Sequence, residues 1–540
     1  MRSTFAGFTT ARLALRASQK ALDVTGQNIS NINTAGYTRQ RLDLVSLSVG
    51  AGSERYKSEH SVHVGNGVLT SGISQIRDPF LDIRFRNEIA HVGGQEQKKD
   101  ILKDLENIFD EVSKKGVQDQ LSDLNTMLQK LSSEVGNKEF DSMVKASADV
   151  LTKMFNQYAH QLEVVKNDQE FNLRKVEIPK LNDILNNIKN LNETIKANHI
   201  HGNPALELLD QRNSLIDELA SYVNIDVKTE RQYLTQGPNA QPGQIDPEGK
   251  FVEVLQIKIK HPQGDLWLIN DNKVAEFKLQ PEESVPPAAP IDFGAYKLEM
   301  TDIQAGNGAK VQDVYEKLRS GAIKSSFDML NRSGEFDANN PERIRGLGYY
   351  QKSLDLLANK IATTFNGLNK YTDVNGVEHS VPLFDANDGA AKITAKNIKI
   401  HDDWQSGASQ IIPSKNTKDL NKMTGANDKI LEMISVLGQK HDFTTDGGKK
   451  LFNGSFQEYF TNMGSVLGLD IKSTQAMMEN HKTVAKEIAN MKDSISAVSL
   501  DEEGMNLLHY QKSYNAAARL MTTLDEAVAT IINNMGVVGR

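Results

Sequence analysis

The sequence predicts a mainly α-helical protein with inserted β domains. Paired terminal helices form a coiled-coil layer, an elongated helical bundle forms the middle, and small β-rich domains lie outside. Three observations predict this fold: heptad patterns at both ends, long helical stripes between them, and a proline-rich segment of alternating polarity. The chain has 540 residues. Single cores rarely exceed ~250–300 residues, so we expect several domains.

The N-terminal segment carries a narrow apolar seam. Large side chains recur every seven residues at Phe8, Leu15, Leu22 and Ile29. Three positions later in each heptad the residue is small, until Ile32 breaks that series. This spacing predicts a helix of roughly 30 residues that packs closely against a neighbouring helix.

The C-terminal segment repeats this pattern with larger side chains. Two series with a seven-residue spacing interlock there: Leu507, Tyr514, Met521, Val528 and Met535, and three positions later Tyr510, Ala517, Leu524 and Ile531. Two such seams at opposite ends of one chain favour helices that pair with each other or with neighbouring subunits. An ordinary helical bundle is the alternative for either seam alone.

Helical stripes cover much of the middle, and a helix is expected at 205–222 after Pro204. Eight of the fourteen prolines fall between 238 and 290, where FVEVLQIKIK (251–260) alternates as a half-buried strand does. The predicted domains are a terminal coiled-coil domain (1–64 and 499–540), a helical wall (65–228, 311–370 and 426–498), a β-rich insert (229–310) and a second insert (371–425).

Composition excludes several classes of function. The net charge of −8 argues against a nucleic-acid partner. The absence of cysteine excludes disulfides and thiol chemistry. No apolar run approaches the roughly 18 residues of a membrane span, and Arg2, Arg12 and Arg16 interrupt any secretory signal. We therefore expect no membrane insertion, and either a cytoplasmic location or export without a cleavable signal.

No motif predicts catalysis. Phosphate-binding loops and nucleophile elbows are absent, and the HxxH spacing of His60 and His63 lacks the helix that zinc proteases need. Surface loops explain such histidines more often than metal binding does. The sequence thus predicts a non-enzyme with no catalytic, cofactor-binding or metal-binding residues and no cofactor.

The two ends resemble a known family. NISNINTAGYTRQR (28–41) is similar to the N-terminal signature of flagellar axial proteins, and SLDEEGMNLLHYQKSYNAAARLMTTLDEAVATIINNM (499–535) is similar to their C-terminal signature. LLDQRNSLIDELASYVNIDV (208–227), SGAIKSSFDMLN (320–331) and SFQEYFTNMGSVLG (455–468) then closely resemble the hook-associated protein 1 family, the first protein of the hook–filament junction. The resemblance covers both ends and most helical parts, but neither insert.

The resemblance implies a structural role in the flagellum. It implies a ring of subunits at the hook tip that joins hook to filament, outside the cell, after unfolded export by the flagellar type III system. The implied partners are other copies of the chain, hook protein, the third hook-associated protein and an export chaperone. The terminal seams would be the assembly interface.

The resemblance also suggests why the first helix ends where it does. The helix must stop where the chain crosses to the next layer, and the amides of Asn28, Asn31 and Asn33 can satisfy backbone groups there. Gly36 can supply the left-handed conformation that ends a helix, and Tyr37 begins the outgoing segment. We assign these five residues to the assembly interface together with the seam residues.

Other interpretations stay open. Another axial protein, such as the third hook-associated protein, hook protein or a flagellin, would keep the terminal helices but should lack LLDQRN (208–213). A cytosolic helical scaffold would keep the heptads without leaving the cell. A secreted enzyme that uses His60 and His63 as metal ligands is the most distant alternative.

Overall fold

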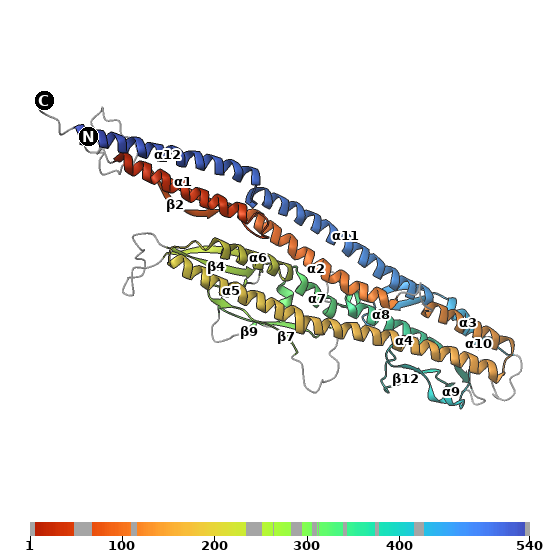
Figure 1. Ribbon diagram of the computed structural model, residues 1–540. Helices are drawn as coiled ribbons and strands as arrows, with labels where there is room; N and C mark the ends of the chain where they lie inside the picture. The colour runs from red at the N-terminus through yellow and green to blue at the C-terminus, as the bar shows by residue number, and fades with distance from the viewer. Residues whose placement is uncertain are drawn as a thin grey trace, which may run out of the picture.

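The computed structural model shows an elongated molecule in which the first and last helices lie side by side at one end (Figure 1). It describes residues 6–47, 67–109, 116–233, 251–262, 264–281, 294–304, 310–311, 313–337, 343–372, 377–414 and 426–534. Met535, His60 and His63 lie outside these residues.

The terminal helices form an antiparallel pair. Helix α1 (Ala6–Ser30) runs toward the body of the molecule, and α12 (Leu500–Asn534) runs back along it (Figure 1). Their approach is close, because a Cβ atom on Gly7 would lie 3.0 Å from Cδ1 of Leu524. Strands β1 (Gln40–Ser46) and β2 (Val68–Gln75) form an antiparallel hairpin against α1.

Long helices build the body. Helix α2 (Pro79–Phe109) packs along α11 (Phe456–Ser496), and these two continue the direction of the terminal pair (Figure 1). The other long helices are α3 (Val117–Ser133), α4 (Lys138–Asn172), α5 (Ile178–Ile200), α6 (Leu206–Tyr222), α7 (Ala322–Asn331), α8 (Leu347–Leu368) and α10 (Asp428–Gly438). Their apolar faces form a continuous core, because each stripe is buried against its neighbours.

Helices α4 and α5 run on without a break. A single π-helical turn, Leu173–Glu177, connects them, and Pro179 follows in the first turn of α5. Pro179 leaves the helix unbroken because it directly follows this π-helical turn, in which the N–H of Ile178 bonds five residues back to the carbonyl of Leu173 and so changes the regular hydrogen-bond pattern that proline would interrupt.

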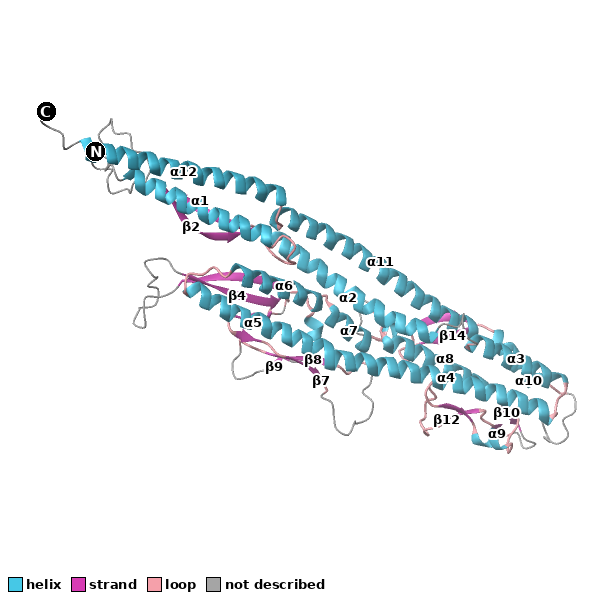
Figure 2. Cartoon of the chain, viewed as in Figure 1, coloured by secondary structure: helices cyan, strands magenta, loops and turns pink. Residues whose placement is uncertain are grey.

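Small antiparallel sheets cover one side of this body (Figure 2). One sheet has the order β3-β4-β5-β6, and its members are β3 (Asp226–Tyr233), β4 (Phe251–Ile259), β5 (Leu266–Asn270) and β6 (Lys273–Val274). A second sheet contains β7 (Phe277–Gln280), β8 (Lys297–Thr301) and β9 (Lys310–Val311). Asn182 of α5 fixes the second sheet, because its amide exchanges two hydrogen bonds of 2.9 Å with the backbone of Phe277.

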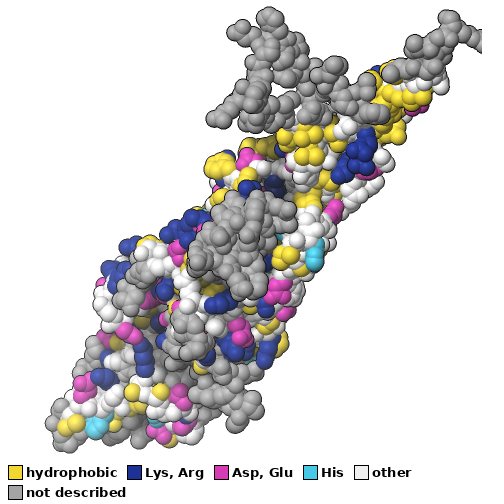
Figure 3. All heavy atoms as spheres, turned by 90° about the vertical axis from the view of Figure 1, so that its left-hand side faces the viewer, with side chains coloured by type: hydrophobic (Ala, Val, Ile, Leu, Met, Phe, Trp, Pro, Cys, Tyr) yellow, Lys and Arg dark blue, Asp and Glu magenta, His cyan; other side chains and the backbone are white. Residues whose placement is uncertain are grey.

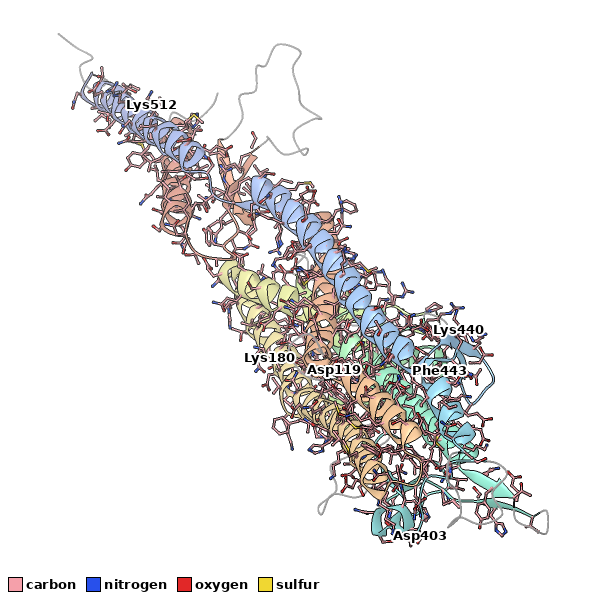
Figure 4. All side chains as sticks on the ribbon, turned by 90° about the vertical axis from the view of Figure 1, so that its right-hand side faces the viewer. Asp119, Lys180, Asp403, Lys440, Phe443 and Lys512 are labelled. Carbon is pink, nitrogen blue, oxygen red and sulfur yellow. The ribbon has the colours of Figure 1, made fainter. Side chains whose placement is uncertain are left out.

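The remaining strands form three hairpins. They are β10 (Lys370–Thr372) with β11 (Glu378–Ser380), β12 (Phe384–Ala386) with β13 (Ile398–Ile400), and β14 (His441–Thr444) with β15 (Lys450–Gly454). The apolar-alternating segment ITAKNIKI (393–400) forms a strand only over its last three residues, because Asn397 bonds to Thr394 and turns the backbone before them. Trp404 of the short helix α9 (Asp402–Ser406) is buried beneath this insert, and Asp403 of the same helix lies at the end of the molecule opposite Lys512 of α12 (Figure 4).

The prediction of a mainly α fold with inserted β domains is confirmed. The helix expected at 205–222 is present as α6. The division into the four predicted domains stays a prediction.

Candidate assembly site at the terminal helices

The seam of α1 divides by side-chain size. The small residues Ala11, Ser18 and Thr25 are buried within the single chain, with exposed fractions of 0%, 8% and 2%. The large residues Phe8, Leu15, Leu22 and Ile29 stay half-buried. Small side chains permit the close approach of α12 and the hairpin, which leaves part of the large apolar row uncovered.

The predicted row on α12 is covered even less. Ala517 is buried, whereas Tyr510, Met521, Leu524 and Val528 are half-buried. Leu507, Tyr514 and Ile531 are exposed by 38%, 38% and 43%. A heptad row on a helix that had all its partners would be buried, so this seam is incompletely covered within one chain.

Three exposed apolar side chains of α12 outside the predicted seam escaped the sequence analysis. Leu508, Leu520 and Ile532 have exposed fractions of 56%, 46% and 70%, and none of them belongs to the two predicted heptad series. Because successive members are twelve positions apart, they point to different sides of the helix. Figure 3 shows hydrophobic side chains gathered over this end of the molecule. The sequence shows these residues as apolar positions outside the heptad series. Only the structure shows that no other described part of the chain covers them.

The hairpin adds apolar surface to the same end. Leu44, Val45 and Leu69 are exposed by 49%, 52% and 47%. Within the described residues this sheet has two strands only. Isolated two-stranded sheets are marginally stable in water, so the hairpin depends on α1 and on whatever covers its other side.

Asn28 is the residue that ends α1 in a defined geometry. Its side chain is 1% exposed. Its Nδ2 donates to the carbonyl of Gln40 at 2.9 Å, and its Oδ1 accepts from the backbone N–H of Gln40 and the hydroxyl of Tyr37, both at 3.0 Å. One buried amide therefore holds the chain where it leaves the helix.

The other residues assigned to this turn have smaller roles within the chain. Asn31 donates to the carbonyl of Gln27, one turn back, while Asn33 and Ile32 are exposed. Gly36 has the expected left-handed conformation, with φ of 78°, but it does not end the helix: α1 ends at Ser30, and Gly36 lies in a later turn closed by the bond from the N–H of Tyr37 to the carbonyl of Thr34. A Cβ atom there would lie 3.2 Å from Oγ of Ser214, so the turn also contacts α6.

The outgoing segment, residues 37–41, contacts α6 through Asp210. The backbone N–H and the hydroxyl of Thr38 donate to the Asp210 carboxylate at 3.0 and 2.6 Å. Burial raises the pKa of Asp210, and the two Thr38 hydrogen bonds oppose this rise. Burial, followed by the charges of Glu207 and Asp210, raises the pKa of Tyr37 to about 12. These contacts give the LLDQRN segment (208–213) a physical role, because it binds the outgoing segment through Asp210.

Arg39 connects the same segment to the start of α12. Its Nε donates to Oε1 of Glu503 at 2.7 Å, and its Nη1 donates to Glu502. Its backbone N–H donates to the carbonyl of Ser496, the last residue of α11, at 2.8 Å. Burial alone would lower the pKa of Arg39, but the two carboxylates outweigh it and the pKa rises. Arg39 therefore spans the break between α11 and α12.

A row of ion pairs extends this connection into the body. Lys492 of α11 lies 3.0 Å from Asp82 of α2 and 3.1 Å from Asp217 of α6. Arg86 of α2 donates to Asp217 at 2.6 Å. Although burial of Asp82 acts to raise its pKa, Arg77 and Lys492 lower it overall. Three helices are thus joined by alternating charges just below the terminal pair.

A cleft of about 1140 Å³ lies beside this connection. Val24 of α1 and Leu42 of β1 line one wall, and Ile200 and Leu206 from the α5–α6 region line the other. The terminal pair therefore stands away from the tip of α5, and the anchoring contacts of Thr38 and Arg39 determine where it sits.

In the part of the chain that the structure describes, no three His, Asp or Glu side chains are placed to hold a metal ion. None of the described helices combines the length and apolar character that crossing a bilayer requires.

The fold and the terminal site define a class of elongated, mainly helical structural proteins whose paired ends carry incompletely covered apolar seams. The family model of the flagellar hook-associated protein FlgK helical domain matches residues 102–384, and that of the flagella basal body rod protein matches residues 8–38. Because the first match spans more than half of the chain, the protein belongs to the flagellar hook-associated protein FlgK family and is a structural component of the flagellum. The resemblance seen in the sequence is confirmed.

Individual relatives agree with this assignment. A flagellar hook-associated protein 1 from Bacillus subtilis (strain 168) is 29% identical over 547 residues, covering 100% of both chains. Its counterpart from Salmonella typhimurium is 22% identical and covers 97% of this chain and 98% of the relative. The solved flagellar hook junction protein FlgK from Burkholderia pseudomallei shares the fold, with a TM-score of 0.52 at 10% identity over 77% of this chain and 100% of that chain.

Proposed function

We propose that this protein assembles as a ring at the hook tip and joins the hook to the filament. The observation that carries the proposal is the uncovered apolar surface of the terminal pair, on a chain that belongs to a hook-associated family. Isolated soluble proteins rarely leave such a surface open over a whole helix. Neighbouring copies would cover α12 and the hairpin, with hook protein on one side and the third hook-associated protein on the other.

The energetics favour assembly through these ends. Full burial of one large apolar side chain contributes about 1.5–3 kcal/mol, and α12 alone exposes several. In this arrangement the seam residues on α1 and α12 provide affinity. The contacts of Arg39 and Thr38 fix the angle at which each subunit body leaves the ring.

We further propose that the chain is exported unfolded through the flagellar type III channel, with a chaperone bound near α12. A chain without cysteine needs no oxidative step to fold after export. The exposed apolar residues of α12 are the type of surface that a chaperone would cover before assembly. The role is structural and not catalytic.

Deletion of the gene in its source organism, followed by electron microscopy, tests the junction role. We expect hooks without filaments and flagellin released into the medium, both reversed by a plasmid copy. Normal filaments on the deletion strain would contradict the proposal, and a cytosolic scaffold would then be the better interpretation.

A further inference from the structure

The seam between α2 and α11 contains a histidine cluster that the proposed function does not use. These helices have 31 and 41 residues, and they connect the terminal pair to the body. The core of their contact is apolar and tightly packed, with Ala90, Ala485 and Ile488 exposed by 0%, 4% and 1%. A titratable group in such a seam affects how firmly the two helices stay together.

The cluster consists of His91, His481 and Glu88. The imidazole rings of His91 and His481 stack across the seam with centroids 4.8 Å apart and planes inclined by 17°. Nδ1 of His481 lies 2.8 Å from Oε2 of Glu88. Glu88 and His91 are three residues apart on α2 and so share one face of that helix. All three side chains are half-buried.

The charge balance within the cluster is uneven. Burial, and then the charge of His481, lower the pKa of His91, while Glu88 opposes this change. One carboxylate therefore faces two imidazoles. With both rings protonated, two cations would lie at stacking distance beside this one carboxylate.

Other charged groups do not balance a second proton. On the same stripe of α2, Arg84 and Lys98 each lie seven residues from His91, and both are cations. The neighbouring residues of α11 that point into the seam are Met478, Ala485 and Ile488, which carry no charge.

The helices α6 and α7 approach α2 through Gly93 and Gly94, and Gly94 lies three residues from His91. Their nearest acidic groups are already engaged. Asp217 of α6 pairs with Arg86 and Lys492, and Asp328 of α7 pairs with Lys324. No carboxylate from these helices is therefore free to compensate the cluster.

We propose that His91, His481 and Glu88 form an acid-sensitive contact that weakens the α2–α11 seam when both histidines are protonated. A histidine whose pKa is lower in the folded than in the unfolded state binds fewer protons in the folded state. Stability is therefore complete above the ordinary histidine pKa of about 6.5 and is lost as the pH falls below it. Acidification would loosen the body beneath the terminal pair, whatever the terminal pair binds.

Thermal unfolding of the full-length protein at pH 7.5 and 5.5 tests the proposal. The variant His91→Phe keeps a stacked ring but removes the second charge, so its Tm should fall less between the two pH values than that of the wild type, by about 1 °C. Glu88→Gln removes the carboxylate of the cluster, so its Tm should fall more between the two pH values than that of the wild type. The control His160→Gln, on the outer side of α4, should behave as the wild type. Equal decreases for the wild type and His91→Phe would overturn the proposal.

A second measurement does not depend on any variant being stable. Hydrogen exchange of the wild type, corrected for intrinsic rates, should show peptides around residues 85–95 and 476–490 losing protection at pH 5.5 before the rest of the body does. Titration of ¹³C-labelled histidine rings should place the pKa of His91 below its ordinary range. A His91 pKa at or above about 6.5, or uniform loss of protection, would also overturn the proposal.

Discussion

Nε of Arg39 lies 2.7 Å from Oε1 of Glu503, although 464 positions separate the two residues in the chain. Glu503 is 2% exposed, so this ion pair is buried where α1, α11 and α12 meet. It joins the outgoing segment of the N-terminal helix to the first turn of the C-terminal helix. The orientation of the terminal pair relative to the body depends on it.

Replacing Arg39 by alanine should destabilise the junction strongly. The substitution leaves the Glu503 carboxylate buried without a partner, which typically costs about 3–5 kcal/mol. Urea unfolding would measure the loss, and adding Glu503→Gln should restore part of it because the buried charge disappears. Arg41→Ala is the control, since its pair with Asp43 is exposed and should contribute at most about 1 kcal/mol. Equal effects of the two arginine substitutions would contradict the assignment.

Asn28→Ala and Asn31→Ala should lower the free energy of unfolding by very different amounts. Asn28→Ala leaves the buried N–H and carbonyl of Gln40 unsatisfied, which we expect to cost about 2–3 kcal/mol. Asn31→Ala removes two exposed hydrogen bonds, one to the carbonyl of Gln27 and one from the hydroxyl of Thr34, and should change stability by less than about 1 kcal/mol. Chemical denaturation of both variants side by side is the measurement. A cost for Asn31→Ala as large as that for Asn28→Ala would show that the amide of Asn28 is not what ends the helix.

Glu177 should make the protein less stable as the pH rises. Burial raises the pKa of Glu177 from 4.5 to about 7, against a hydrogen bond from Ser326 that lowers it. The folded state therefore binds more protons than the unfolded state between these values, so stability falls as the pH rises through this window. Glu177→Gln should be roughly 1–3 kcal/mol more stable than the wild type at pH 8 and similar to it at pH 5.

Denaturation of the Glu177 variant at both pH values checks this, with the exposed Glu479→Gln as a control that should show no such difference. The amide of glutamine can donate to the Ser326 hydroxyl, so the hydrogen bonds from Gln97 and Asn172 need not be lost. A stability gain that is the same at pH 5 and pH 8 would refute the role given to ionisation.

Gly93→Ala should separate α2 from α6. A Cβ atom at this position would lie 2.3 Å from the carbonyl oxygen of Ser221, which is backbone and has little freedom to move. We expect a loss of at least about 2 kcal/mol, measured by thermal or urea unfolding. Gly26→Ala is the matched control in α1, where nothing lies within 4 Å, and it should stabilise the helix by up to about 1 kcal/mol. Retained stability in Gly93→Ala would mean that the two helices are not held this close.

A charge at an exposed apolar position of α12 outside the seam should abolish assembly but not folding. Leu508→Asp and Leu520→Asp alter exposed side chains, so the stability of the monomer should change by no more than about 0.5–1 kcal/mol. In complemented deletion cells we expect filaments to be lost, because a neighbouring subunit would have to bury the new carboxylate. Asn187→Asp, exposed on α5, adds the same charge to the body and should leave filaments intact. Normal filaments with both α12 variants would place the interface elsewhere.

Much of the fold could be predicted because helices are encoded locally. The seven-residue spacing of Phe8, Leu15 and Leu22 spans only two turns of helix between successive members, and the glycine at position 36 affects a turn made by its immediate neighbours. The β insert was visible for the same reason, since alternation over FVEVLQIKIK identifies a strand without knowledge of its partners. The motif that identified the family is also a run of neighbours in the chain.

Only the tertiary structure decided which members of those patterns matter and how. Three asparagines near the end of α1 were equivalent in the sequence, but Asn28 alone faces Gln40 and is buried. The apolar residues of α12 outside the seam, such as Leu508, were visible in the sequence, but their exposure was not, because burial depends on what lies opposite. Arg39 and Glu503, like His91 and His481, meet across hundreds of residues. Such contacts arise from the packing of whole helices, and a local pattern in one segment carries no information about the segment that folds against it.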